Sequence, residues 1–214
     1  MKNKSSIIVK TILLIGVALT VVALVVMLTM TPAPKTKANR SKEIGIENEN
    51  FDIGGDFVLT DVNGVKVDSR NMRDKILLIY FGFTYCPDIC PASLSEMTRA
   101  LEELKNNPDK VQPIFVTIDP NRDSPKQLKE YFGNFDSRIM ALTGTQDEID
   151  SVAKSFRVYY SKAIDGKENT EHYLLNHSSF YYLVGKDGKL IKYYAPGTSG
   201  VDMGLDIKKY IQEH

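Results

Sequence analysis

The chain has few cysteines, no excess of charge of either sign and no internal repeat. Only two of its 214 residues are cysteine, which excludes a disulfide-rich scaffold. Basic residues (Lys and Arg) and acidic residues (Asp and Glu) both number 27, so a nucleic acid or another polyanion is not expected as a partner. A hydrophobic content of 43% is enough for the core of one domain of ordinary size, with further segments outside it.

The N-terminal segment predicts a membrane anchor. No charged residue lies between Thr11 and Met30, and a helix of this length spans about 30 Å, the thickness of the hydrocarbon layer. A cleavable signal peptide has a shorter apolar core and a small-x-small cleavage site, and this segment has neither. We therefore expect an uncleaved transmembrane helix within residues 1–30, a solvated linker at 31–50, and a folded domain at 51–214.

The orientation of the anchor is less clear from charge alone. Basic residues flank both ends of the apolar segment, so the positive-inside rule does not decide between the two orientations. The long C-terminal part can be translocated whatever its charge, and we place the folded domain outside the cytoplasm.

The order of the expected elements predicts an α/β domain of the thioredoxin type, with a central mixed sheet flanked by helices. Hairpin turns are indicated by Asn63-Gly64 and Asp187-Gly188, and helix starts by the capping boxes at Ser124 and Thr145. We expect strands at 57–62, 65–67, 76–83, 111–118, 139–142, 178–184 and 189–194, and helices at 92–105, 124–132, 145–156 and 201–212.

The two cysteines, Cys86 and Cys90, lie between an apolar strand and an amphipathic helix. Backbone N–H groups at the start of a helix favour thiolates. If the first turn is helical, the two side chains share one face, with Cβ atoms about 5–6 Å apart. Such a pair can bind one soft metal ion or form a disulfide after modest movement. A disulfide closing so short a loop stabilises little, so a chemical role is favoured over a structural one.

Several motifs, in order, resemble the Sco (SenC) family of copper-binding proteins over about residues 51–212. They are Phe57-x-Leu59-Thr60-Asp61; Tyr80-Phe81-Gly82-Phe83-Thr84-x-Cys86-Pro87-Asp88-Ile89-Cys90-Pro91; Ile118-Asp119-Pro120-x-Arg122-Asp123-Ser124-Pro125; Leu142-Thr143-Gly144-Thr145; Val158-Tyr159-Tyr160; and Asn176-His177-Ser178-Ser179-Phe180-Tyr181-Tyr182-Leu183.

This resemblance implies a single-pass inner-membrane protein whose thioredoxin-like domain faces the periplasm or its organellar equivalent. It implies copper delivery to the dinuclear copper site of cytochrome c oxidase, or maintenance of the thiols there. The partners would be the copper-bearing oxidase subunit and an upstream copper donor. The implied metal ligands are Cys86, Cys90 and His177. Asn176 stands where many members have Asp, so a carboxylate beside the histidine is not expected in this chain.

Two thiolates and one imidazole form a soft three-coordinate site suited to Cu(I), and added oxygen or nitrogen ligands would also hold Cu(II). We interpret the other histidines, His172 and His214, as solvated, and keep His172 as a weaker alternative ligand. Asp119 follows a strand and faces the edge of the sheet where α/β sites gather. It either supports the site or only makes a turn with Pro120, and the sequence leaves both open.

The main alternative is a thiol–disulfide oxidoreductase that keeps the oxidase cysteines reduced. The fold and the cysteine pair support it. Three residues rather than two separate the cysteines, however, and no proline occurs at 176–179, where thioredoxins place a cis-proline. A zinc site would need a fourth ligand or a water, and a peroxiredoxin-like peroxidase would need Pro-x-x-x-Thr before Cys86. A metallochaperone is therefore favoured over an enzyme.

Overall fold

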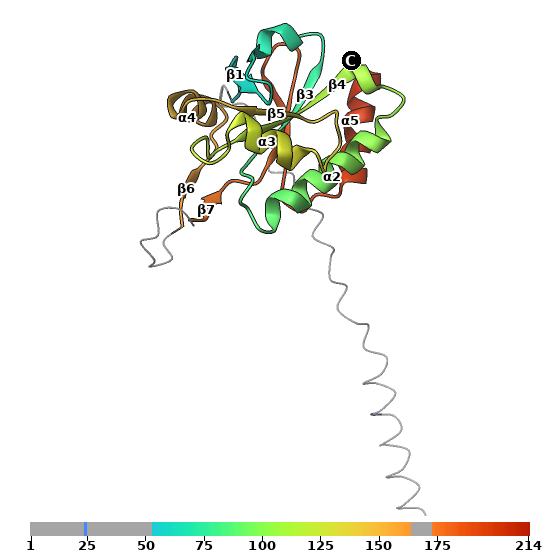
Figure 1. Cartoon of the computed structure of the whole chain (residues 1–214). Coiled ribbons are helices and arrows are strands. Elements are labelled where there is room, and N and C mark those ends of the chain that lie inside the picture. The colour runs from blue at the N-terminus through green and yellow to red at the C-terminus, as the bar shows by residue number, and fades with distance from the viewer. Residues whose placement is uncertain (1–23, 25–52, 164–172) are drawn as a thin grey trace, which may run out of the picture. The chain divides into compact units, whose positions relative to one another are not determined.

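The computed structural model describes Leu24, residues 53–163 and residues 173–214. Apart from Leu24, the predicted anchor and linker lie outside these residues, and so does His172. No helix in the described part of the chain is long and apolar enough to span a membrane. The described residues other than Leu24 form the folded domain (Figure 1).

A seven-stranded mixed sheet forms the centre of the domain, with strand order β2-β1-β5-β4-β3-β8-β9. β3 pairs in parallel with β4, and β4 pairs in parallel with β5. The remaining neighbours pair antiparallel. The strands are β1 (Val58–Asp61), β2 (Lys66–Asp68), β3 (Ile76–Gly82), β4 (Val111–Thr117), β5 (Met140–Thr143), β8 (Tyr181–Val184) and β9 (Leu190–Tyr194).

Four α-helices pack around this sheet, which confirms the predicted α/β architecture. α2 packs against α5, whereas α3 lies next to β5 and α4 lies next to β1 (Figure 1). The helices are α2 (Ile89–Glu103), α3 (Pro125–Phe132), α4 (Gln146–Ser155) and α5 (Gly200–Glu213), and short 3-10 turns occur at Ser69–Met72 and Pro108–Lys110.

The predicted helix starts at Ser124 and Thr145 are confirmed, and their side chains explain them. The Ser124 hydroxyl accepts a hydrogen bond from the Gln127 N–H. Thr145 and Glu148 form a reciprocal capping box, in which each side chain accepts from the other residue's backbone N–H. These bonds satisfy donors that the first helical turn leaves unpaired.

β3 is the longest fully buried strand of the described sheet, and all seven of its residues are buried. It lies between β4 and β8, so both its edges are paired, and the burial of all its residues means that neither face is open to solvent. This explains its uninterrupted apolar sequence. The large side chains around it form the aromatic part of the core: Tyr80, Phe81, Phe83, Phe115, Phe156 and Tyr181.

Two short strands were not predicted. β6 (Tyr160–Lys162) pairs antiparallel with β7 (Leu175–His177) in a separate two-stranded sheet, here called the ribbon. Each strand has three residues and a mixed polar sequence, so neither shows hydrophobic periodicity. The strand expected at 178–184 accordingly begins only at Tyr181.

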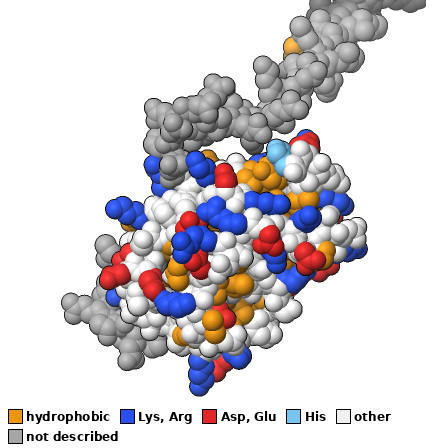
Figure 2. Space-filling model, turned by 90° about the horizontal axis from the view of Figure 1, so that it is seen from above, with side chains coloured by type: hydrophobic (Ala, Val, Ile, Leu, Met, Phe, Trp, Pro, Cys, Tyr) orange, Lys and Arg blue, Asp and Glu red, His pale blue; other side chains and the backbone are white. Residues whose placement is uncertain are grey.

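The outer surface has mixed charge. Viewed from above, Lys, Arg, Asp and Glu are interspersed with small apolar patches (Figure 2). This face carries no continuous field of a single sign, as a zero net charge would lead one to expect.

Two glycines allow α5 to approach α2 closely. A Cβ atom on Gly204 would lie 2.7 Å from the carbonyl oxygen of Ala100, and one on Gly200 would lie 2.1 Å from that of Glu96. Both oxygens belong to the backbone of α2, which cannot move aside as a side chain can. The absence of side chains here therefore sets the distance between the two helices.

We expect Gly204→Val to destabilise the domain by about 1–3 kcal/mol, because the added carbons have no space against α2. Chemical denaturation measures the effect. The control is Leu205→Val, which creates the same residue at the next, exposed position of α5 and should change stability by less than about 0.5 kcal/mol. Equal stability of the two variants would contradict this account of the helix contact.

Candidate metal centre

The cysteines lie in the turn from β3 to α2. Cys86 is half-buried in the turn itself, whereas Cys90 is the second residue of α2 and is fully buried. The two therefore do not share a helical face as the sequence suggested, because α2 begins only at Ile89. The Cys90 N–H donates to Cys86 Sγ at 3.3 Å, so the start of the helix still provides a donor to a sulfur.

Space for the Cys90 sulfur depends on a glycine at the end of β3. A Cβ atom on Gly82 would lie 2.9 Å from Cys90 Sγ and 2.9 Å from the Phe115 ring. Any larger residue would push the sulfur or the ring out of place. Gly82 thus contributes to the site without touching a ligand.

His177 ends the ribbon strand β7, and its Nε2 lies 3.6 Å from Cys90 Sγ. Its Nδ1 lies 3.2 Å from the Ser178 carbonyl oxygen. A hydrogen on Nδ1 would be donated to that carbonyl, which leaves the Nε2 lone pair directed toward the sulfur. The rings of Phe83 and Tyr80 meet the imidazole edge-on, with centroids 5.8 and 6.4 Å away, and restrict its rotation.

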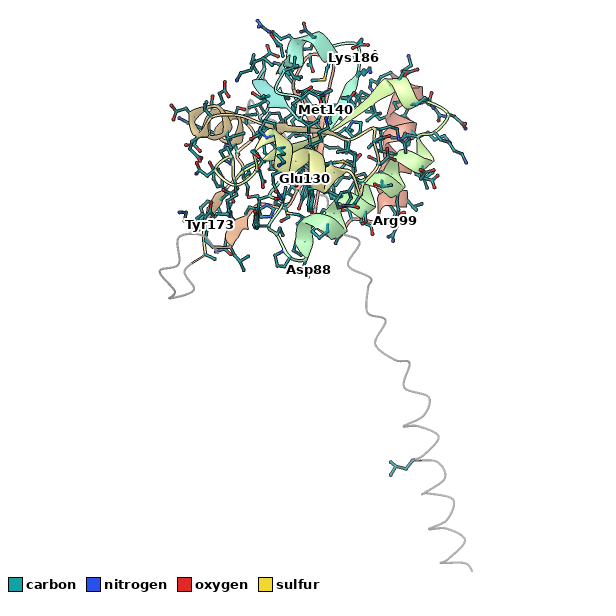
Figure 3. All side chains as sticks on the ribbon, in the orientation of Figure 1. Asp88, Arg99, Glu130, Met140, Tyr173 and Lys186 are labelled. Carbon is teal, nitrogen blue, oxygen red and sulfur yellow. The ribbon has the colours of Figure 1, made fainter. Side chains whose placement is uncertain are left out.

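The structure thus brings together the three predicted site residues. The two sulfurs and a ring nitrogen of His177 all lie within 4.8 Å of one another. They come from segments about 90 positions apart in the chain. The site lies at the edge of the domain marked in Figure 3 by Asp88, which stands between the cysteines, and by Tyr173, which precedes β7; Lys186 is labelled at the opposite edge. His214 instead stacks on Tyr210 at 4.3 Å between ring centroids and takes no part in the cluster.

The two thiols have opposite acidities in the metal-free protein. The pKa of Cys86 is lowered to about 4, chiefly by the hydrogen bond that the Cys90 thiol donates, with a further donor at the Cys90 N–H. The pKa of Cys90 is raised, because its proton is held by Cys86 and its sulfur is buried. The Tyr80 hydroxyl donates to Cys90 Sγ at 3.8 Å, which lowers the pKa of Cys90 but is outweighed by the first two causes. At neutral pH, Cys86 is therefore the thiolate and Cys90 the thiol.

Three polar residues that follow β4, Asp119, Arg122 and Asp123, support the site, and only Asp119 was given a possible role from the sequence. Asp119 accepts hydrogen bonds from Arg122 Nε and from the Tyr173 hydroxyl, both at 2.6 Å, so it does more than make a turn with Pro120. Asp123 is fully buried and accepts from the Thr84 N–H in the cysteine turn at 3.0 Å. The clustering of Asp, Arg and Asp after a buried strand was the available signal.

Comparison with known proteins places these features in a family. The SCO1/SenC family model matches residues 46–212. The chain belongs to the SCO1/SenC family.

Relatives of this Sco-family chain include an SCO2-like protein of Rickettsia conorii, which is 39% identical over 95% of the chain and 97% of the relative. The Arabidopsis thaliana ScoI structure with copper bound is 37% identical, with a TM-score of 0.69 over 76% of this chain and 99% of that one. The copper-bound ScoI of Bradyrhizobium japonicum gives 37% identity and a TM-score of 0.67 over 74% and 99% of the two chains.

The acidity of Cys86 can be tested by alkylation. We expect iodoacetamide to modify Cys86 at nearly the same rate at about pH 6 and pH 8, because its thiolate persists over this range. The rate for an ordinary thiol falls about tenfold per pH unit below its pKa. Peptide mass spectrometry of the metal-free protein follows each cysteine.

Cys90→Ala is the matched variant, since it removes the largest cause of the low pKa. Its Cys86 should regain most of the ordinary pH dependence. A wild-type rate that already falls steeply toward pH 6 would show that Cys86 is not the thiolate.

Proposed function

We propose that this chain is a membrane-anchored copper metallochaperone for the dinuclear copper site of cytochrome c oxidase. Cys86, Cys90 and His177 would hold the copper. The observation that carries the proposal is the convergence of two sulfurs and one imidazole nitrogen within 4.8 Å. This soft donor set fits Cu(I), and further oxygen or nitrogen ligands would accommodate Cu(II).

The different exposure of the two cysteines suits a site that releases its cargo. Cys90 is fully buried, whereas Cys86 is half-buried beside the exposed side chains of Tyr85 and Ile89. An incoming ligand from a partner can approach on the Cys86 side, form a bond to copper and displace one donor at a time. Such ligand exchange never requires the free ion.

Related proteins support the choice of metal and partner. The Arabidopsis and Bradyrhizobium structures contain copper. BsSco, 31% identical with a TM-score of 0.60, is described as a member of the Sco family of cytochrome c oxidase assembly proteins. By extension, we propose the copper-bearing oxidase subunit as the acceptor and a separate protein as the copper donor. The domain at 51–214 would face the periplasm or its organellar equivalent, tethered to the inner membrane by the segment at 1–30.

A second candidate is thiol–disulfide exchange with the oxidase cysteines. The low pKa and partial exposure of Cys86 favour nucleophilic attack, and Cys90 lies close enough to resolve a mixed disulfide. A disulfide switch has also been identified in BsSco. This role uses the same two sulfurs and has no need of His177.

Copper titration of the full chain in detergent tests the first proposal. We expect the wild-type protein to bind one copper ion per chain, with a sulfur-to-copper charge-transfer band in the Cu(II) form. His177→Ala should lose affinity for Cu(II) most, because the imidazole is the only nitrogen donor in the trio. The control is His214→Ala, at an exposed histidine stacked on Tyr210.

Equal copper stoichiometry and affinity in the wild type and His177→Ala would remove the histidine from the site. Thiol exchange gives the opposite pattern. Under the second candidate, exchange at thioredoxin-like rates persists in His177→Ala and disappears in either Cys86→Ser or Cys90→Ser.

The anchor is tested by alkaline extraction of membranes from cells that express the chain. We expect the full chain to stay in the membrane pellet, because an uncleaved apolar helix of this length is not released by high pH. A variant that lacks residues 1–30 should appear in the soluble fraction. Release of the full chain would refute the anchor while leaving the copper site untouched.

A further inference from the structure

His177 lies outside the main sheet, which the chain re-enters only at Tyr181, and side-chain contacts help to fix its position. The ribbon strands β6 and β7 pair only with each other, in a sheet separate from the seven-stranded one. An isolated two-stranded ribbon is at best marginally stable in water. The residues that tie the ribbon to the domain therefore determine where the imidazole lies.

One tie joins the ribbon to the segment that follows β4. Arg122 Nη1 donates to the Tyr173 carbonyl oxygen at 2.8 Å, and its guanidinium carbon lies 3.6 Å from the centroid of the Tyr173 ring. Asp119 accepts both Arg122 Nε and the Tyr173 hydroxyl at 2.6 Å. Tyr173 leads directly into β7, and Figure 3 shows it beside the ribbon. Arg122 thus holds the incoming end of the strand that carries His177.

The same guanidinium also faces the cysteine turn. Its carbon lies 4.6 Å from the centroid of the Tyr85 ring and 5.9 Å from that of the Phe83 ring. Phe83 in turn packs edge-on against the His177 imidazole. Arg122 is therefore in contact with both pieces of chain that supply the proposed ligands.

The burial of the Arg122–Asp119 ion pair is not explained by a gain in stability. The side chains of Arg122 and Asp119 are only 13% and 2% exposed, and removing such a pair from water costs free energy that the ion pair need not repay. Arg122 Nη2 is buried and has no hydrogen-bond partner among the described residues, which adds to the cost. A planar guanidinium does, however, form hydrogen bonds and ring contacts only in fixed directions, so it orients the groups that it contacts.

We propose that Arg122 is a positioning residue that sets His177 over the cysteine turn by locking Tyr173 and Tyr85 against the segment after β4. Its loss frees the β7 end of the ribbon. The cysteine turn keeps its separate attachment, in which Asp123 binds the backbone and hydroxyl of Thr84. The proposal rests on the proposed function only where its test uses copper.

The test compares Arg122→Met with the wild type in the full chain. In the metal-free protein, hydrogen exchange should become faster at the Ala163 and Ser178 amides, which donate to the Leu174 and Tyr159 carbonyl oxygens across the ribbon, and stay slow in β3 and β4. With Cu(II), the charge-transfer spectrum should move toward that of His177→Ala. Cu(II) affinity should fall about 10- to 100-fold, the usual cost of losing a residue that orients a metal ligand.

The double variant with His177→Ala separates positioning from general destabilisation. If Arg122 acts through the imidazole, Arg122→Met causes no further loss of Cu(II) affinity once His177 is gone. A further loss would show that Arg122 acts on the cysteines or on the fold, and would overturn the proposal. Arg122→Lys, which keeps a charged donor but not the planar fork, should fall between Arg122→Met and the wild type.

Arg138→Met is the matched control. Arg138 also binds a nearby carboxylate, that of Asp136 at 2.6 Å, and a carbonyl oxygen, that of Leu101 at 3.1 Å. It precedes β5, so it lies at the end of the parallel strands away from the cysteines. Arg138→Met should leave hydrogen exchange in the ribbon and the copper spectrum unchanged.

If Arg122→Met had the same hydrogen exchange in the ribbon and the same copper charge-transfer spectrum as the wild type, the positioning role would be refuted. If the wild type bound no copper, the proposed function would fail, while the exchange measurement would still decide whether Arg122 holds the ribbon.

Discussion

The buried carboxylate of Asp123 is the interaction on which the geometry of the site depends. It accepts hydrogen bonds from the Thr84 N–H at 3.0 Å and from the hydroxyls of Thr84 and Thr117 at 2.6 Å. Burial raises the pKa of this carboxyl group, so the interior does not favour its charge. Its contribution is therefore to geometry more than to stability: it attaches the turn before Cys86 to the end of β4, beside the residues that hold the ribbon.

The three candidate donors are held with decreasing firmness. Cys90 lies in a helix under the fully buried ring of Tyr80, in space that only a glycine at position 82 leaves open. Cys86 lies in a turn that Thr84 connects to Asp123. His177 lies on a ribbon that pairs with no strand of the main sheet. If the three donors hold copper as proposed, ligand exchange would begin at the histidine or at Cys86 and end at Cys90.

Much of the fold could be predicted because local signals were strong, whereas the three site residues were predicted together only through the resemblance to the Sco family. β3 is apolar throughout, two helices begin with side-chain caps at Ser124 and Thr145, and the cysteines stand in a specific motif. β6 and β7 could not be predicted, because a strand of three residues with mixed polarity is too short to show a hydrophobic period. The two strands come together only in the folded protein. The role of Arg122 was hidden for a related reason. A buried arginine looks like a solvated one in sequence, and its partners Tyr85 and Tyr173 are distant along the chain.

The imidazole is what separates a metal site from a dithiol redox site in this fold. A thiol–disulfide exchanger needs an exposed nucleophile and a second thiol, and Cys86 and Cys90 would meet that need alone. Here Nε2 of His177 lies 3.6 Å from the sulfur of Cys90, the thiol that is buried and slow to react. Its Nδ1 faces the Ser178 carbonyl, and aromatic edges limit the ring's rotation. Holding the imidazole ring in this orientation costs conformational freedom. Copper coordination as proposed would account for that cost, because it would use all three donors at once.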